Sequence, residues 1–388
     1  MKILLVSSKY QPEYSGSGFR AHNTYKRLEK DYPLTFDVLS NSINFQGNRN
    51  YTHEDKEVYC ISSPYKIPSN KSLIRNILII VGMLWEIFYT WKYIRKNIGQ
   101  YDLLHTFGNS WSIGLLTLYF SWKKKPIIRE LCNEMPNPLY PIQIQSMIKK
   151  VFQKDNTLVV AISLRLERLA RKFGMKHIWT RPNPIDEKKY FVANNKYTLR
   201  NKLCKFGEDD IVLSLIANYI DRKNQLFALE VLKKLPTQYK LVLAGPLKNE
   251  GKKYYDKVLS KIKLWGLEDR VDITNGFVEN FDEYLKMSDV FLFPSKAEGL
   301  GTPLLEAQAC AIPVVSNDIE GISDMVIKPG KGGYYHDFDV PLWTEAIIKA
   351  ASIPHEVLLE NVDFIRSISA HSIIDKEYFE KIKKLIND

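Results

Sequence analysis

The chain has 388 residues, of which 45 % are hydrophobic, and its four cysteines form no CxxC pair. This length predicts two domains with sizeable cores, and the scattered cysteines argue against a zinc site or a disulfide framework and fit a reducing cytosol. The net charge of +11 is uneven: residues 1–180 carry 26 lysines and arginines against 13 acids, whereas residues 181–388 carry 29 against 31. The basic first half indicates either an anionic partner (a membrane surface, a nucleic acid or a phosphorylated acceptor) or simply a lysine-rich surface.

The first predicted strand, Lys2–Ser8, leads through a loop into a helix-like pattern. Gly16, Ser17 and Gly18 would let a ligand approach the backbone closely at the start of this helix. The same residues match the G-x-G-x-x-A fingerprint of dinucleotide-binding proteins, which leaves an NAD-dependent oxidoreductase open as an alternative. The fingerprint, however, normally follows the strand at once, and here residues 9–15 intervene.

After a second predicted strand over residues 34–40, the polar residues 41–72 indicate a mobile, substrate-side segment. Residues 72–100 combine an apolar run with an amphipathic portion that carries Trp91 and several cations. Arg75 and Glu86 indicate a segment too short and too charged to span a membrane. It is either an interfacial helix, whose apolar side dips into a bilayer, or a core helix of the domain.

The first domain continues with a predicted strand over residues 102–109, which contains His105, and with a strand and loop over residues 125–138. A third strand, residues 157–163, precedes a basic amphipathic helix that ends at Gly174. The prolines of residues 178–191 indicate a domain boundary. We therefore expect one domain over residues 1–180 and a second over residues 181–371.

The second domain opens with a strand, a loop and an amphipathic helix. Lys223 is expected to open this helix, where an ammonium group neutralises phosphate oxygens. Its neighbour Arg222 can be read as a second ligand of the phosphate or as an ordinary surface cation. Further strands are predicted over residues 239–246 and 267–278, the latter ending in a turn at Gly276.

Residues 289–317 predict a strand, a glycine-bearing loop, a short helix with Thr302 as N-cap and Pro303 as first residue, and a second strand. The loop carries Glu298 and the helix carries Glu306. Such a loop lies at the carboxyl end of a strand, where α/β sheets bind ligands. The helix start suits a phosphate, and two carboxylates suit sugar hydroxyls. Alternatively, Glu306 complements the helix dipole and Glu298 is a solvated loop residue.

The stretch "PSKAEGLGTPLLEAQACAIPVV", with seven residues between Glu298 and Glu306, resembles the signature of family 4 of the retaining glycosyltransferases. This resemblance implies the GT-B fold: an α/β chain of two Rossmann-like domains that face each other across a cleft. It also implies that the terminal helix, residues 372–388, crosses back onto the first domain.

The resemblance assigns roles to individual residues. Lys223 and the backbone amides of residues 299–302 would hold the donor diphosphate, Glu306 the ribose, Glu298 the sugar hydroxyls, and His105 would face the transferred sugar from the other domain. The family's usual arginine is replaced by Asn218, so Arg222 is its candidate substitute. Also expected are donor contacts of Gly16, Ser17, Gly18, Gly276, Gly299, Leu300, Gly301 and Thr302, and acceptor contacts of Asn133 and Glu134.

The expected function is retaining transfer of a sugar from a nucleotide-diphosphate sugar to a saccharide acceptor, which we take to be lipid-linked, in surface polysaccharide biosynthesis. We expect no required metal, no other cofactor and no nucleic-acid partner. The expected location is cytoplasmic, peripheral on an anionic inner membrane face. Two alternatives stay open: the NAD-dependent oxidoreductase, and a non-catalytic membrane- or nucleic-acid-binding protein with a degenerate transferase domain, for which Asn218 is the best support.

Overall fold

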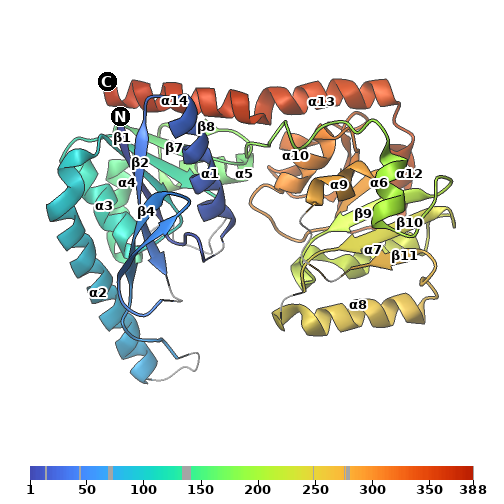
Figure 1. The fold of residues 1–388 in the computed structure, drawn as a ribbon, viewed down its shortest axis with the longest axis horizontal. Coiled ribbons are helices and arrows are strands. Elements are labelled where there is room, and N and C mark those ends of the chain that lie inside the picture. Colours follow the sequence, from blue (N-terminus) through green and yellow to red (C-terminus); the bar gives the residue numbers. More distant parts are fainter. Residues whose placement is uncertain are drawn as a thin grey trace. The chain divides into compact units, whose positions relative to one another are not determined.

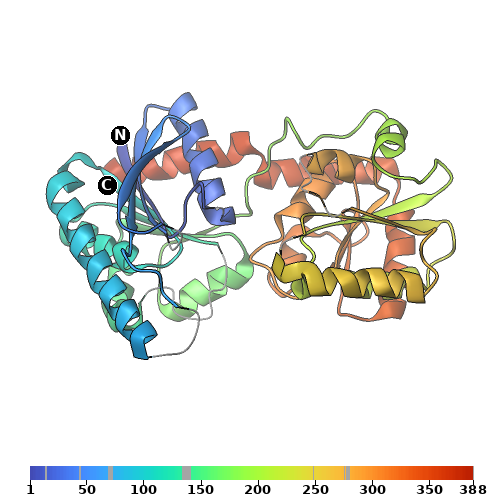
Figure 2. The same ribbon diagram turned by 60° about the horizontal axis from the view of Figure 1, so that its bottom comes forward.

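The computed structural model describes the whole chain except residues 14, 43–44, 69–72, 133–140, 248, 275, 277–279 and 388. The chain divides into two compact units, which are drawn in Figures 1 and 2. Unit 1 comprises Met1–Arg181 with Asp375–Asp388, and unit 2 comprises Pro182–Ile374. The boundaries expected from the sequence, after residues 180 and 371, lie one and three residues earlier than these.

Unit 1 is built on a sheet that has eight strands within its described residues. Ile3, Leu4, Leu5 and Val6 of the first strand are completely buried, as expected for a strand with helices on both faces. Neighbouring strands are parallel apart from an antiparallel hairpin at one edge. In sheet order, starting with that hairpin, the strands are β3 (Arg49–His53), β4 (Lys56–Ser62), β2 (Thr35–Ser42), β1 (Lys2–Ser7), β5 (Leu103–Phe107), β6 (Ile127–Leu131), β7 (Thr157–Ala161) and β8 (Ile178–Thr180).

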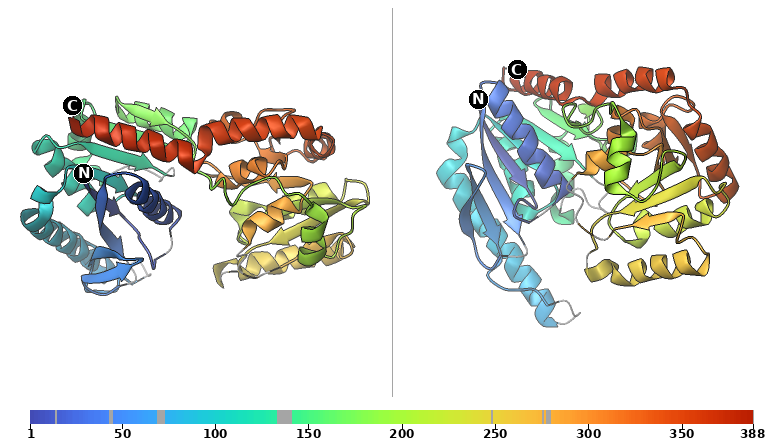
Figure 3. Two further views of the ribbon diagram at one scale, coloured as in Figure 1. Left: turned by 45° about the horizontal axis from the view of Figure 1, so that its top comes forward. Right: turned by 45° about the vertical axis from the view of Figure 1, so that its right-hand side comes forward.

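The hairpin corrects one prediction, because residues 49–62 form paired strands rather than an irregular segment. Helices cover both faces of the sheet: Figure 3 shows the first helix on one face and the second and third on the other. Gly174, in the left-handed conformation (φ 92°), ends the fifth helix as predicted. The helices of unit 1 are α1 (Gly16–Asp31), α2 (Leu73–Asn97), α3 (Trp111–Trp122), α4 (Gln145–Val151) and α5 (Leu164–Phe173), with 3-10 turns η1 (Ile98–Gln100) and η2 (Ile142–Ile144).

The C-terminal helix α14 (His371–Asn387) belongs to unit 1 from Asp375 onward, which confirms that the chain crosses back. Arg27 of α1 donates from Nε and Nη2 to the carboxylate of Asp375 (2.5 and 3.0 Å). The rings of Tyr32 and Phe379 stack 4.3 Å apart. An ion pair and an aromatic contact thus hold α14 against α1.

Unit 2 contains a parallel sheet with six strands in its described part. Trp343 is completely buried against Phe227 (5.1 Å between ring centroids) in the core on one face. The strands, in sheet order, are β11 (Val271–Ile273), β10 (Tyr239–Ala244), β9 (Ile211–Ile216), β12 (Val290–Phe293), β13 (Val314–Asn317) and β14 (Gly333–His336). The helices are α6 (Lys196–Leu203), α7 (Gln225–Leu232), α8 (Lys252–Leu264), α9 (Phe281–Lys286), α10 (Thr302–Ala309), α11 (Ser323–Val326), α12 (Val340–Ala351) and α13 (His355–Ser369), with 3-10 turns η3 (Asp221–Lys223) and η4 (Asn249–Gly251).

Candidate functional site

The candidate donor site lies where the strand order of unit 2 reverses, between β9 and β12. At such a switch point the loops that leave two neighbouring strands diverge and make room for a ligand. Here β9 leads into residues 217–224 and β12 into residues 294–301. The backbone N–H of Lys296 donates to the carbonyl of Arg222 (2.9 Å), so the two loops are joined.

Two cations of the first loop converge on one carboxylate of the second. Lys223 Nζ and Arg222 Nη1 each donate to Glu298 Oε1 at 2.6 Å, and Arg222 Nη1 also donates to the carbonyl of Ala297 (2.6 Å). The side chains of Glu298 and Lys223 are only 14 % and 16 % exposed, so Glu298 is not a solvated loop residue. Burial lowers the pKa of Lys223, and the charge of Glu298 opposes this shift. The cluster keeps a net positive charge, which suits an anionic ligand.

The predicted start of the helix after Glu298 is wrong in one detail. Gly301, not Thr302, is the N-cap of α10, and no side chain caps this helix. The Thr302 hydroxyl instead accepts a hydrogen bond from Asn183 Nδ2 (2.7 Å). Gly301 is required here because its φ is +79° and an added Cβ would lie 2.9 Å from a ring carbon of Phe293. The uncapped helix start leaves backbone N–H groups for an anion.

The start of the preceding helix also differs from the prediction. Lys223 ends the 3-10 turn η3 and does not open α7, which begins at Gln225 after Asn224 in the left-handed conformation (φ 55°). Asn218 lies earlier in the same loop, and its backbone carbonyl accepts a hydrogen bond from Gln225 Nε2 (3.0 Å). Asn218 occupies the position of the family's usual arginine, and Arg222 is its candidate substitute. The structure brings Arg222 beside Lys223.

Glu306 lies on α10, partly buried, and forms a hydrogen bond with the phenol of the buried Tyr190. Burial raises the pKa of Glu306 to about 7, although the Tyr190 hydrogen bond and the charge of Lys189 lower it. Tyr190 comes from the segment that enters unit 2, a partner that sequence reasoning missed. Of the other predicted donor residues of unit 2, Leu300 is buried in the loop after Glu298 and Gly276 is exposed.

In unit 1 the predicted glycine loop also lies at a switch point, between β1 and β5. Gly16 is exposed, Ser17 is half-buried and Gly18 is buried. Ser15 caps α1 by accepting from the N–H of Gly18 (3.0 Å). Residues 8–15 separate β1 from α1, which does not fit the direct strand-to-helix turn that a dinucleotide fingerprint requires.

Gly18 and Gly16 provide a matched test of this loop. A Cβ at Gly18 would lie 2.4 Å from the carbonyl oxygen of Lys9, whereas nothing lies within 4 Å of a Cβ at Gly16. Gly18→Ala is expected to lower the melting temperature by several degrees, because the loop backbone must shift. Gly16→Ala is expected to leave it equal or slightly higher, since alanine is favoured inside a helix. Differential scanning calorimetry of both variants checks the difference; equal effects would contradict the close approach.

The predicted contact between His105 and the transferred sugar is wrong in this structure. His105 lies in the middle of β5 with its side chain completely buried, so it has no surface for a substrate. Its Nδ1 is hydrogen-bonded to the phenol of Tyr25 (2.8 Å), and its Nε2 lies 3.8 Å from Glu130 Oε2. Burial lowers the pKa of His105 despite the opposing effect of Glu130. His105 is thus part of a polar cluster inside unit 1.

Glu130, Arg181 and Tyr378 complete this cluster, which the sequence did not reveal. Arg181 Nη2 donates to both oxygens of Glu130 (3.0 and 3.3 Å) and to the Tyr378 hydroxyl (2.5 Å). Arg181 is the last residue before the chain leaves unit 1, and Tyr378 lies just after it returns. The cluster therefore fixes both crossings onto unit 1. The predicted acceptor residues Asn133 and Glu134 lie outside the described residues.

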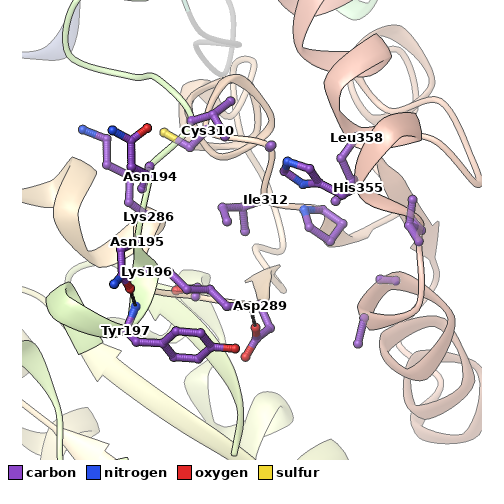
Figure 4. A pocket seen from close by; sticks show the side chains of 18 residues that line it. Asn194, Asn195, Lys196, Tyr197, Lys286, Asp289, Cys310, Ile312, His355 and Leu358 are labelled. Carbon is purple, nitrogen blue, oxygen red and sulfur yellow. Dashed lines mark hydrogen bonds and ion pairs between the residues drawn. The ribbon is translucent and has the colours of Figure 1, made fainter. Parts of the chain in front are cut away.

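Figure 4 shows a pocket of unit 2, about 590 Å³ in volume, whose lining does not include Arg222, Lys223, Glu298 or Glu306. It is lined by Lys286, Asp289, Cys310, Ile312 and His355, among others. Asp289 and Pro313 immediately precede β12 and β13, so the pocket opens at the amino ends of these strands. Among the described residues, two groups have metal-ligand character, His22–His53–Glu54 and Asp186–Glu187–His371, and neither contains a predicted site residue.

Comparison with known proteins finds similarity in one part of the sequence. Residues 196–361, all in unit 2, match the family model of the glycosyl transferases group 1. The chain is 34 % identical over 184 residues to N-acetyl-alpha-D-glucosaminyl L-malate synthase of Bacillus anthracis, covering 47 % of this chain and 46 % of the relative. It is 28 % identical over 176 residues to UDP-Gal:alpha-D-GlcNAc-diphosphoundecaprenol alpha-1,3-galactosyltransferase of Escherichia coli, covering 43 % of each. The matches thus span less than half the length of these curated relatives.

The likeness to solved structures extends over the whole chain. Anabaena Alr3699/HepE in complex with UDP superposes with a TM-score of 0.74 at 16 % sequence identity, covering 99 % of this chain and 100 % of that one. This likeness, together with the two Rossmann-like units, shows that the chain has the predicted GT-B fold. Both loops of the candidate donor site, residues 217–224 and 294–301, lie within the segment that the group 1 family model covers.

Proposed function

We propose that the protein is a retaining, family 4-type glycosyltransferase that moves a sugar, of the hexosyl type, from a nucleotide-diphosphate sugar to a saccharide acceptor. The observation that carries this proposal is the convergence of Arg222 and Lys223 on Glu298 at the switch point of unit 2, beside the uncapped start of α10. The family match of residues 196–361 supports it.

The diphosphate would bind to Lys223, Arg222 and the backbone amides of residues 299–302. Negative charge builds on the diphosphate as the bond to the sugar breaks, and donors already held in place stabilise that charge most effectively. Glu298 positions both cations, since each donates to its Oε1. Its other oxygen would accept from sugar hydroxyls, and Glu306 would accept from the ribose. Gly16, Ser17 and Gly18 remain proposed contacts of unit 1.

We assign no nucleophile. In the proposed reaction the acceptor hydroxyl attacks on the face from which the diphosphate leaves, and a donor phosphate oxygen assists removal of the hydroxyl proton. Glu298 therefore contributes binding and orientation, and the Glu298–Glu306 pair is not the acid–base couple of a glycoside hydrolase. No required metal and no additional cofactor are part of the proposal.

We further propose a lipid-linked saccharide as the acceptor, in a surface polysaccharide pathway, with the protein on the cytoplasmic face of the membrane. The name of the Escherichia coli relative supports this acceptor class, because it describes transfer to a diphosphoundecaprenol-linked sugar. The basic residues of the first half are compatible with an anionic surface.

Thermal unfolding with UDP, GDP, ADP and NADH, each supplied separately, tests the donor site. A true ligand at about 100 times its dissociation constant is expected to stabilise the protein by roughly 2.7 kcal/mol. We expect one nucleoside diphosphate to produce this shift, and we expect Lys223→Met to remove it while the exposed Lys331→Met retains it. A shift with NADH alone would replace the proposal with the oxidoreductase, and no shift with any of the four would contradict a preformed donor site.

A further inference from the structure

One face of α2 is apolar, exposed and continuous. Its residues recur every three or four positions, so they lie in a single stripe along the helix. Each of their side chains is between 51 % and 76 % exposed. Isolated exposed apolar residues are normal, whereas a contiguous stripe of this size marks an interaction surface. The stripe consists of Leu73, Ile77, Ile80, Leu84, Phe88 and Trp91.

The first half of α2 is exposed on more than one side. Ile74 and Ile79, which lie off the stripe, are 65 % and 40 % exposed. Figures 1 and 2 show this end of α2 extending beyond the rest of unit 1. A folded protein partner covers one side of a helix, whereas lipid chains surround it. The exposure of apolar residues around the helix therefore favours a bilayer as the occupant.

The second half of α2 is fixed to unit 1. Thr90, Tyr93 and Ile94 are buried, and Glu86 Oε1 accepts hydrogen bonds from the backbone N–H and hydroxyl of Ser112 (2.7 and 3.0 Å). Leu73–Gln100 is long and apolar enough to cross a membrane by length and composition, so the sequence-based expectation of too short a segment is wrong. A spanning helix, however, would break these contacts. The packed half therefore limits α2 to entering one leaflet.

Aromatic and basic residues follow the stripe at its packed end. The rings of Trp91 and Tyr119 are 6.3 Å apart, and those of Tyr119 and Trp122 are 5.5 Å apart. Lys123 lies over the ring of Trp122 (4.1 Å), and Trp122 is 69 % exposed. Lys92, Arg95 and Lys96 are exposed on the last turns of α2. Along the stripe, to which Arg75 of the first turn does not belong, the surface changes from aliphatic to aromatic and then to the basic last turns. This is the order of layers from hydrocarbon to phosphate in a bilayer.

We propose that α2 is a membrane anchor of the interfacial type. Its first half, Leu73–Leu84, inserts into the hydrocarbon of one leaflet at a tilt, Trp91 and Trp122 lie at the interface, and the neighbouring cations contact lipid phosphates. The anchor needs no catalytic activity and stands independently of the transferase proposal. If both hold, it places unit 1 at the surface where a lipid-linked acceptor resides.

Flotation of the full chain with vesicles tests the anchor. We expect binding to phosphatidylcholine vesicles that contain phosphatidylglycerol, and weaker binding as salt rises or phosphatidylglycerol is omitted. The triple variant Ile77→Gln, Ile80→Gln, Leu84→Gln is expected to lower the partition coefficient at least about tenfold on both kinds of vesicle. Its matched control, Leu259→Gln with Leu264→Gln and Leu342→Gln in unit 2, changes three exposed leucines and is expected to bind as the unchanged protein does.

Two further variants test the basic residues and the tryptophans of the anchor separately. Lys92→Gln with Lys96→Gln and Lys123→Gln is expected to weaken binding to the anionic vesicles only. Quenching of tryptophan fluorescence by brominated lipids is expected to fall in Trp91→Phe with Trp122→Phe, which directly reports lipid contact. The anchor would be overturned if the unchanged protein did not float at low salt, or if the Gln triple variant floated as the unchanged protein does. It would also be overturned if the Gln triple variant kept its flotation but lost a dimer that the unchanged protein forms in solution. Nucleoside diphosphate binding by the same Gln variant, measured in solution, separates this outcome from failure of the transferase proposal.

Discussion

Lys223→Met is expected to reduce kcat/KM for sugar transfer by about 10²–10³-fold, because it removes a positive charge held at the leaving diphosphate. The fold should persist, since Glu298 keeps its ion pair with Arg222 (2.6 Å). The charge on the diphosphate is greatest in the transition state, so most of the loss is expected in kcat rather than in KM. Initial rates of nucleoside diphosphate release, with the donor chosen by the thermal screen, measure both.

Lys331→Met is the matched control for this variant. Lys331 also lies in unit 2, but it is 54 % exposed and pairs with the exposed Glu360 at 3.2 Å. Its replacement is expected to leave kcat and KM unchanged, because exposed ion pairs contribute little. If Lys223→Met kept the full rate of transfer, Lys223 would have no role at the diphosphate, and Arg222 and the helix amides would have to supply the stabilising charge.

The parallel sheet of unit 2 could be predicted because its strands are short apolar runs. Residues 290–293 and 314–317 are completely or almost completely buried, and a glycine-bearing loop and a proline-initiated helix separate them. Local patterns of this kind determine the order of elements and thereby place Glu298 at the carboxyl end of a strand. The pairing of Glu298 with Lys223 and Arg222, 75 and 76 positions earlier, was not predictable, since it depends on how two loops meet.

The β3–β4 hairpin was missed because its turn lacks the usual signal. Two-residue hairpin turns favour Asn-Gly or Asp-Gly, since both positions need a positive φ. Here Glu54 and Asp55 occupy the turn with φ of 44° and 66°. The polar character of the strands themselves added to the difficulty, because β3 is an edge strand with no completely buried residue.

The burial of His105 was hidden for a different reason. A histidine in a strand can face a site or the interior, and a sequence does not show which. His105 becomes internal because Tyr25 of α1, Glu130 of β6 and Tyr378 of α14 surround it with hydrogen-bonding groups and aromatic rings. These partners lie up to 273 positions from His105 in the sequence, so only the tertiary structure brings the cluster together.

Glu130→Gln is expected to destabilise unit 1 by about 3–5 kcal/mol, because it leaves the charge of Arg181 buried without its counter-ion. Arg181 is 4 % exposed and Glu130 is completely buried, so water cannot replace the lost carboxylate. Urea unfolding followed by tryptophan fluorescence measures the loss, and Trp179, whose ring lies 4.9 Å from that of Tyr378, contributes to this signal beside the cluster. Asp55→Asn removes the same charge from an exposed pair with Lys26 and is expected to leave the unfolding free energy nearly unchanged.

The contribution of Glu130 to the free energy of unfolding should also depend on pH, in a defined direction. Burial raises the pKa of Glu130, but Arg181, His105 and Arg20 outweigh it and lower the pKa to about 2. A carboxyl whose pKa is lower in the folded than in the unfolded protein stabilises the fold above its unfolded pKa, which is about 4.3. The difference in unfolding free energy between the unchanged protein and Glu130→Gln is therefore expected to be constant from pH 7 to about 5 and to shrink as the pH falls from about 5 to about 2. A difference that stayed constant down to pH 2.5 would show that Glu130 has the same pKa in the folded and the unfolded protein, which would contradict a stabilising ion pair between Glu130 and Arg181.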